Sequence, residues 1–115
     1  MKYALIGMVL LCMTRLAPAQ ASNLWHYSTE DGLPGATVYR LTQSEEGYIW
    51  IATDYGLSRF DGHRFMNYDS ELGLPGNEVI HMVLDQQDRI VFGSFSGKIA
   101  CLHQNKFLQA ENTDW

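Results

Sequence analysis

Histidine and cysteine are two of the residue types in this 115-residue chain that could bind a metal ion or transfer protons. The four histidines occupy unrelated positions in the repeat described below, and Cys12 and Cys101 lack the Cys/His spacing that binds zinc. We therefore expect no metal ion, no cofactor and no catalytic residue among them. We interpret the histidines as surface or turn residues; they are His26, His63, His81 and His103.

Several aspartates could be imagined as acid–base pairs, but their positions coincide with predicted turns, where an Asp side chain caps the backbone. They are Asp31, Asp54, Asp61, Asp85 and Asp88. No nucleophile elbow, P-loop or dinucleotide motif is visible, and Gly32-Leu33-Pro34-Gly35 contains a proline and only two spaced glycines. We interpret that segment as a bend and expect no enzyme activity from this chain.

Aromatic side chains could stack on a sugar ring, and four of them are candidates: Trp25, Trp50, Tyr55 and Tyr68. Trp50 lies in the middle of a predicted strand, so we expect it in the core. Tyr55 lies in the predicted loop of residues 53–56, where its ring can reach solvent. Tyr55 is therefore our one candidate for ligand contact.

Composition sets the class of protein. Hydrophobic residues make up 46% and charged residues 18%, which excludes a disordered or collagen-like chain. The length allows one domain at most. The net charge is −5 and no run of Lys or Arg occurs, so nucleic acid is not an expected partner.

An export signal is predicted at the N-terminus. Lys2 precedes an apolar run over residues 3–13, which is too short to span a bilayer. Ala19-Gln20-Ala21 forms an A-x-A cleavage site. The sequence therefore predicts a signal peptide over residues 1–21 and an exported part over residues 22–115.

Two details qualify this leader. Arg15 fits export less well, and a buried N-terminal strand or helix is the alternative interpretation. Leu11 stands before Cys12, where a lipoprotein signal needs a small residue, so a lipid anchor is disfavoured. Cys101 has no cysteine partner after cleavage, and we expect it to be buried and inert.

Two copies of one unit follow the leader, at about residues 28–68 and 69–110. A shift of 41 places Gly32-Leu33-Pro34-Gly35 on Gly73-Leu74-Pro75-Gly76, and one extra residue after Gly97 changes the shift to 42. A period of about 40–45 residues is typical of propeller blades, with helical repeats as the main competitor. The other aligned pairs are Tyr27 and Tyr68, Val38 and Val79, Ile49 and Ile90, Gly56 and Gly97, Leu57 and Ile99, Phe60 and Leu102, and Phe65 and Phe107.

Short β-rich runs separated by turn residues leave no room for long helices. Each copy has four such runs, so we predict an all-β fold with two four-stranded antiparallel blades of an incomplete β-propeller. The predicted strands are 38–43, 48–53, 57–61 and 64–68 in the first copy, and 79–84, 90–94, 99–102 and 106–108 in the second.

Turn residues support this division. Asp61-Gly62 is typical of a two-residue type I′ hairpin, while Gly56 and Gly97 suit left-handed positions of longer loops. The second copy has His103-Gln104-Asn105 in place of Asp61-Gly62, and we place its extra residue there. The turn signal for its last hairpin is therefore weaker than that of the first copy.

The apolar pattern predicts how the strands are layered. Residues 49–52 and 90–93 are apolar at successive positions, so both faces of these strands must be buried, as in stacked blades. Residues 64–68 mix polar and apolar side chains, as an outer strand does. Residues 24–27 align with 65–68, so we predict an outer strand there that lacks its own blade.

Three segments together resemble the two-component regulator propeller repeat. They are Asp31-Gly32-Leu33-Pro34, the segment 46–53 and the segment 56–62, beside the family's typical D-G-L-P, G-x-I-W-I-G-T and G-L-x-R-Y-D-G. The likeness covers nearly all of residues 24–108, with Ala52 where glycine is usual. In this repeat we assign structural roles to Gly32, Leu33, Pro34, Trp50, Gly56, Asp61, Gly62, Gly73, Leu74, Pro75 and Gly97.

The resemblance implies a sensing role. Such repeats form large propellers on the outer side of the bacterial cytoplasmic membrane, sense ligands that are often saccharides, and signal through a further β-domain and a membrane helix to a histidine kinase or another output module. His81 lies in a strand pattern without the helix and acidic neighbour of a phosphoacceptor, so it is not the phosphorylation site.

Two repeats are too few for a closed propeller, which needs about four to eight blades. Repeat units depend on their neighbours for burial. We therefore expect this chain to be the N-terminal part of a longer receptor, or to assemble with further blades in other chains. Any membrane contact would come through a downstream segment.

Three interpretations remain open. The first is an extracytoplasmic ligand-sensing propeller segment of a two-component sensor kinase. The second is the N-terminal part of an exported, carbohydrate-active propeller enzyme, whose catalytic residues would lie in later blades. The third is a gene remnant without a function of its own.

Overall fold

The structure is a computed structural model that describes residues 21–87 and 89–109. The predicted leader lies outside these residues apart from Ala21. The described part is all-β, with one short 3-10 helix and no α-helix, as predicted. Its elements are η2 (Thr29–Asp31), β1 (Val38–Gln43), β2 (Ile49–Thr53), β3 (Gly56–Phe60), β4 (Phe65–Tyr68), β5 (Val79–Leu84), β6 (Ile90–Ser94), β7 (Ile99–His103) and β8 (Lys106–Gln109).

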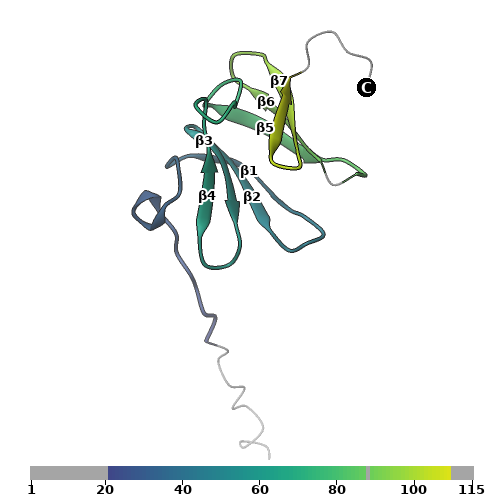
Figure 1. Cartoon of the computed structure of the whole chain (residues 1–115). Helices are drawn as coiled ribbons and strands as arrows, with labels where there is room; N and C mark the ends of the chain where they lie inside the picture. Colours follow the sequence, from purple (N-terminus) through teal and green to yellow (C-terminus); the bar gives the residue numbers. More distant parts are fainter. Residues whose placement is uncertain (1–20, 88, 110–115) are drawn as a thin grey trace, which may run out of the picture.

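The strands form two antiparallel four-stranded sheets, in the orders β1-β2-β3-β4 and β5-β6-β7-β8 (Figure 1). Each strand therefore pairs with the next one along the chain, as in a meander. The ladder between the first two strands is irregular at Val38/Arg40 in one sheet and at Val79/His81 in the other. These positions differ by 41 residues, so the repeat seen in the sequence extends to a detail of the backbone pairing.

The predicted strands agree with the observed ones within one residue, but the predicted strand at residues 24–27 is not present. These residues adopt no regular structure, and Leu24 and Trp25 are exposed. A strand needs a hydrogen-bonded neighbour, and no described strand pairs with this segment. Tyr27 nevertheless packs on the first sheet, with its ring centroid 4.9 Å from that of Phe60 and 5.6 Å from that of Phe65.

The predicted type I′ turn at Asp61-Gly62 is wrong. Such a turn needs two residues at positive φ, and only Gly62 has one, in a four-residue loop closed by a hydrogen bond from the Asp61 amide to the Arg64 carbonyl. The two-residue turn lies in the second sheet instead. There Gln104 (φ 49°) and Asn105 (φ 60°) join β7 to β8.

The extra residue of the second copy lies in the β6–β7 turn, beside Gly97 where the shift changes, and the placement at residues 103–105 is wrong. In the first sheet Thr53 pairs with Gly56, so Asp54 and Tyr55 form a two-residue turn. In the second sheet Gly93 pairs with Ile99, and the Ser94 amide donates to the Lys98 carbonyl. The turn between β6 and β7 is therefore the longer one, and the β7–β8 hairpin is the more regular.

The two sheets stack on each other, with β5 lying against β1 and β2. The first strands of the two sheets are thus nearest neighbours, as inner strands of adjacent blades are. We call the side of the first sheet that bears Leu41, Ile49 and Phe60 its leading face, and the side that bears Trp50, Ala52 and Leu57 its trailing face. The equivalent positions define the two faces of the second sheet.

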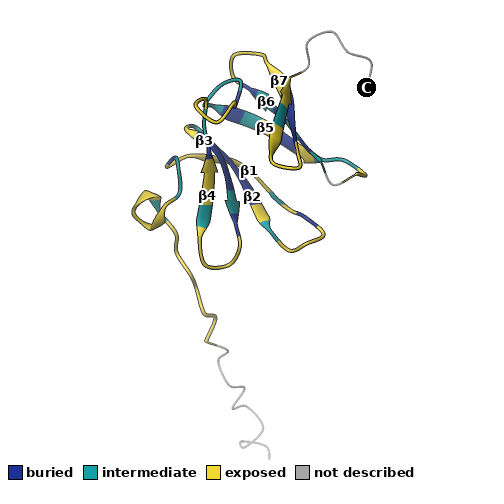
Figure 2. Cartoon of the chain, in the orientation of Figure 1, coloured by how far each residue is buried: buried dark blue, intermediate teal, exposed yellow. Residues whose placement is uncertain are grey.

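The core lies between the trailing face of the first sheet and the leading face of the second. Trp50, Ala52, Leu57 and Tyr68 of the first sheet form one buried cluster with residues of the second. Those residues include Val79, Met82, Ile90, Phe92 and Leu102. Figure 2 shows the buried positions concentrated on the strands and the exposed ones at the turns and outer edges.

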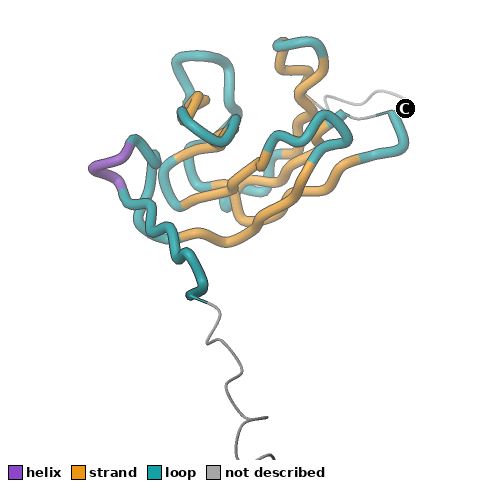
Figure 3. The backbone as a smooth tube through the Cα atoms, turned by 90° about the horizontal axis from the view of Figure 1, so that it is seen from below, coloured by secondary structure: helices purple, strands orange, loops and turns teal. Residues whose placement is uncertain are grey.

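The Gly-Leu-Pro-Gly segments are bends at the entry to each sheet, as predicted. Gly32 (φ 109°) and Gly73 (φ 100°) are both left-handed and end equivalent turns, and Figure 3 shows the first of these turns as η2. A Cβ at Gly32 would meet Phe65, and one at Gly73 would meet Phe107. In each segment the leucine after this glycine lies on the leading face of its sheet, and Leu74 is buried there.

Candidate ligand-contact sites

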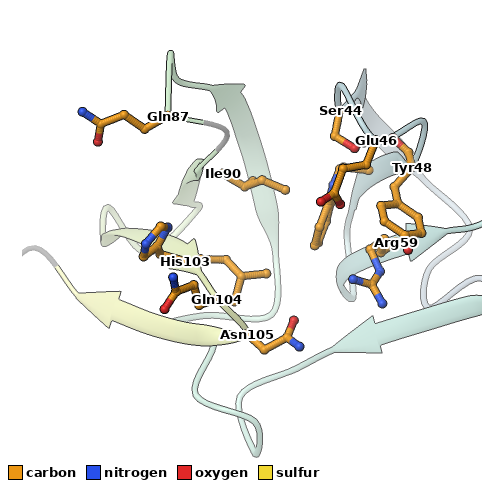
Figure 4. Close-up of a pocket in the computed structure, with 11 residues that line it drawn as sticks. Ser44, Glu46, Tyr48, Arg59, Gln87, Ile90, His103, Gln104 and Asn105 are labelled. Atoms are coloured by element: carbon orange, nitrogen blue, oxygen red, sulfur yellow. Dashed lines mark hydrogen bonds between the residues drawn. The ribbon is translucent and has the colours of Figure 1, made fainter.

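A cleft of about 320 Å³ opens between the two sheets, at the end where the β1–β2, β5–β6 and β7–β8 turns lie (Figure 4). One wall comes from the trailing face of the first sheet and the β1–β2 turn. The other comes from the leading face of the second sheet and its turns. The lining residues are Ser44, Glu46, Tyr48, Trp50 and Arg59 on one side and Gln87, Ile90, Leu102, His103, Gln104 and Asn105 on the other.

Arg59 is the cation of this cleft. Antiparallel pairing of β2 and β3 sets it directly beside Trp50. Its guanidinium carbon lies 4.5 Å from the ring centroid of Tyr48 and 5.8 Å from the Trp50 ring, so the charge is held by cation–π contacts. Among the described residues its Nη2 contacts the Met66 sulfur at 3.3 Å, and no carboxylate pairs with it. Its donors remain available to an acceptor that enters the cleft.

The opposite wall combines an apolar base with a polar rim. Ile90 and Leu102 are buried and belong to the core cluster. Gln104 and Asn105, both at positive φ, form the tight turn between β7 and β8 and line the cleft. Two side-chain amides thus lie across the cleft from Arg59 and Glu46 (Figure 4). Amides and a guanidinium are suited to hydrogen bonding with hydroxyl or carboxylate oxygens.

The cleft is lined by hydrogen-bonding and aromatic side chains, and His103 is its one histidine. His103 forms no hydrogen bond or ion pair with a carboxylate in the part of the chain that the structure describes. No group of three or more His, Cys, Asp or Glu residues that could hold a metal ion occurs among those residues. The side chains that line the cleft can make hydrogen bonds and aromatic contacts with a ligand.

Tyr55, the predicted ligand-contact residue, lies at the opposite end of the sheets. It is 67% exposed in the β2–β3 turn and lines a second hollow, of about 330 Å³, with the connection between the two sheets. Asp69, Glu71 and Asn77 line the same hollow. Tyr55 is thus accessible, and it does not meet the cleft that holds Arg59.

The aspartates occupy turns, as their sequence positions predicted. Asp61 accepts hydrogen bonds from the amides of His63 (2.8 Å) and Arg64 (2.7 Å), and these bonds lower the pKa of its carboxyl. Asp54 accepts from the Thr37 amide. Asp31 accepts from the Ser28 amide at the start of η2. Asp88 lies outside the described residues.

Asp85 shapes the β5–β6 turn in the same way. Its carboxylate accepts from the backbone amides of Arg89 (2.9 Å) and Gln87 (2.8 Å) and forms an ion pair with the Arg89 side chain at 2.6 Å. The amide bond from Arg89 is the largest of the effects that lower the pKa of Asp85. These carboxylates are engaged by the backbone and are not placed as acid–base pairs.

The remaining predicted residues are placed as follows. Trp50 is 7% exposed and belongs to the core cluster, and Cys101 is buried as a free thiol. All four histidines are exposed. Trp25 is exposed and lines neither hollow, while Tyr68 is buried, and loss of hydration raises the pKa of its hydroxyl.

Sequence reasoning missed Arg59 as a candidate contact. Arg59 is the strand partner of Trp50, but this pairing follows from the hairpin register, and the register depends on the turn length, which only the structure gives. The turn residues Gln104 and Asn105 were missed because they come from the other sheet. A site between two repeats is not visible within either repeat alone.

Comparison with known families confirms the resemblance of the first copy. Residues 32–55 match the family described as two component regulator propeller. This stretch runs from the first Gly-Leu-Pro-Gly bend through β1 and β2 to the turn that carries Tyr55. No curated protein matches the chain. Within the described residues, no helix is long and apolar enough to cross a membrane.

Proposed function

We propose, from the two component regulator propeller repeat that the chain carries, that it is the extracytoplasmic ligand-sensing segment of a bacterial two-component receptor. The match at residues 32–55 is the observation that carries this proposal. The chain would be exported by its leader and would form the N-terminal part of a longer sensor kinase. It would have no enzyme activity itself.

The interblade cleft supports a sensing role. Arg59, Glu46 and the amides of Gln104 and Asn105 surround it, which is the chemistry of a binding site for a polyhydroxylated or acidic ligand. A saccharide is the class we propose. The two walls of the cleft belong to different repeats. Ligand binding would therefore change how the two sheets pack against each other, and this change would carry the signal.

Coding sequence downstream of the Trp115 codon tests the receptor context. We expect an open frame with more repeats, a membrane helix and a kinase module. A catalytic constellation in later blades, without a membrane helix or output module, would support the exported carbohydrate-active enzyme instead. A stop codon directly after Trp115 would contradict the longer sensor kinase.

Ligand binding tests the cleft. The full chain is applied to an array of oligosaccharides that includes uronic acids, and the variant Arg59→Met is compared with Arg64→Met, a control at an exposed arginine. A hydrogen bond to a charged group contributes about 1.5–3 kcal/mol, so Arg59→Met should weaken binding by about tenfold or more. Equal binding by both variants would exclude Arg59 from the site.

A further inference from the structure

Arg59 brings a positive charge into the cleft between the two sheets and has no carboxylate partner among residues 21–87 and 89–109. Its guanidinium lies against the rings of Tyr48 and Trp50. A cation–π contact orients the guanidinium but occupies none of its N–H donors. In the described part of the chain only its Nη2 contacts an acceptor, the Met66 sulfur, which is a weak one. Most of the donors of Arg59 are therefore free to bind an anion that enters the cleft.

The second copy shows how such a charge is neutralised when the partner is part of the fold. The place of Tyr48 is taken there by Arg89, which forms an ion pair with Asp85 at 2.6 Å. The first copy has Ser44 where the second has Asp85. The charge of Arg89 is thus satisfied within its own turn, whereas Arg59 points into a cleft that a ligand can enter.

The groups around Arg59 suit the hydroxyl groups of a sugar. Gln104 and Asn105 lie across the cleft from it, and their side-chain amides both donate and accept hydrogen bonds (Figure 4). Ile90 and Leu102 form an apolar floor between these amides and the first sheet, against which the less polar side of a sugar ring can lie. A ligand with one carboxylate and several hydroxyl groups therefore matches the lining of the cleft.

Glu46 limits which anions the cleft can accept. It is exposed in the β1–β2 turn, lines the same wall as Arg59, and forms no ion pair among the described residues. Its carboxylate can accept a hydrogen bond from a hydroxyl group, but it repels a second negative charge. Arg59 and Glu46 together therefore favour a ligand whose carboxylate and hydroxyl groups lie on different sides of one sugar unit.

We propose that the cleft binds an acidic saccharide, with a uronic carboxylate on Arg59 and a hydroxyl group donating to Glu46. A guanidinium matches a carboxylate especially well, because two parallel N–H groups can bind both oxygens. This proposal rests on the proposed sensing role. It adds the charge of the ligand and the way in which the ligand lies between the two sheets.

Pairs of ligands that differ only in charge test the proposal. The full chain is titrated with oligomers of galacturonic, glucuronic and mannuronic acid, and with the methyl ester of each, in which the carboxylate is replaced by an uncharged ester. A hydrogen bond between charged groups is stronger than one to a neutral group. An acid that binds should therefore bind at least about tenfold more tightly than its ester.

Two variants should move the ratio of acid affinity to ester affinity in opposite directions. Arg59→Gln should bring the ratio close to one. Glu46→Gln removes a like charge and keeps an accepting oxygen, so it should raise the ratio above that of the parent chain. Arg64→Gln and Glu30→Gln remove one charge of each sign at exposed residues outside the cleft and should keep the parent ratio. The ratio compares two ligands on one variant, so a general loss of stability leaves it unchanged.

The outcomes separate this proposal from the sensing role. A parent ratio that persists in Arg59→Gln would place the carboxylate elsewhere, and a ratio that stays the same or falls in Glu46→Gln would exclude the assigned place of Glu46. Either result would overturn the proposal. Esters that bind the parent chain as tightly as the acids would also overturn it but would leave the sensing role intact. Binding of neither acids nor esters would contradict both.

Discussion

The leading faces of the two sheets carry equivalent residues in opposite surroundings. Ile49 and Ile90 occupy the same place in the repeat, yet Ile49 is 37% exposed and Ile90 2% exposed. The backbone pairing around them is the same, but Ile90 belongs to the core cluster between the two sheets, and Ile49 lies on the other side of the first sheet. Burial in this molecule is therefore a property of the contact between repeats, and each repeat by itself leaves an apolar face open to water.

The largest difference is expected between two glycines that the 41-residue shift aligns but that the turns of different length place differently. A Cβ at Gly56 (φ 134°) would lie 2.6 Å from the Tyr68 carbonyl oxygen, whereas Gly97 (φ 80°) has open space around it. Gly56→Ala combines backbone strain with overpacking and should cost about 3 kcal/mol or more. Gly97→Ala should cost about 1–2 kcal/mol, from the left-handed conformation alone. Equal losses of unfolding free energy for the two variants, measured in urea, would contradict this difference between the two glycines.

A second pair of substitutions compares the covered and open leading faces. Met82→Ala removes a buried side chain and should cost about 2–5 kcal/mol. Leu41→Ala, at the equivalent position, should cost less than about 1 kcal/mol, because most of the Leu41 side chain is already in water. Both are measured by urea unfolding. A loss at Leu41 as large as that at Met82 would show that the first face is covered within one chain.

The last hairpins of the two sheets differ in turn type and should respond differently to the same dipeptide. Gln104→Asn with Asn105→Gly fits the two positive φ values of that turn and should stabilise the chain by about 1 kcal/mol. Gly62→Asn with His63→Gly places the same dipeptide in the four-residue loop, where His63 has no positive φ. Thermal unfolding should show no gain there, and a gain at both sites would contradict the assigned turn types.

The smallest change in stability is expected from a change of pH, which acts on Asp85 in the first hairpin of the second sheet but not on Ser44, its equivalent in the first sheet. The pKa of Asp85 is lowered in the folded state, so its charged form stabilises the fold above the ordinary Asp pKa of about 3.9, and this contribution is lost as pH falls through the folded value. Asp85→Asn should therefore destabilise the chain at neutral pH and have little effect in strong acid. Ser44 occupies the equivalent position in the first sheet, and Ser44→Ala should have the same effect at both pH values. A pH-independent effect of Asp85→Asn would contradict the role of its charge.

The sequence was sufficient to predict the strands because strand pairing is local within each repeat. The 41-residue shift and the successive apolar residues around Trp50 and Phe92 indicated eight strands and two stacked sheets, and all eight are present. The strand expected at residues 24–27 was wrong because a strand depends on a hydrogen-bonded partner. No described strand provides one, although Tyr27 still packs where the repeat predicts.

Turns and sites were less predictable because they depend on register and on neighbours. Asp61-Gly62 has the composition of a two-residue turn, but the Asp61 side chain bonds the amides of His63 and Arg64 and shapes a longer loop. Gln104 and Asn105 adopt positive φ without a glycine, so their residue types did not indicate a two-residue turn. The cleft around Arg59 uses both sheets, and its existence follows only from their stacking.

Nuclear Overhauser contacts between the sheets test most directly whether they stack as neighbouring blades. Phe92 and Phe107 should show contacts to Trp50 and Tyr68 on the trailing face of the first sheet, and Tyr68 is expected within about 6 Å of Phe107. Contacts of Phe92 to Ile51 on the leading face of the first sheet, in place of those to Trp50 and Tyr68, would indicate a closed sandwich and would contradict the account.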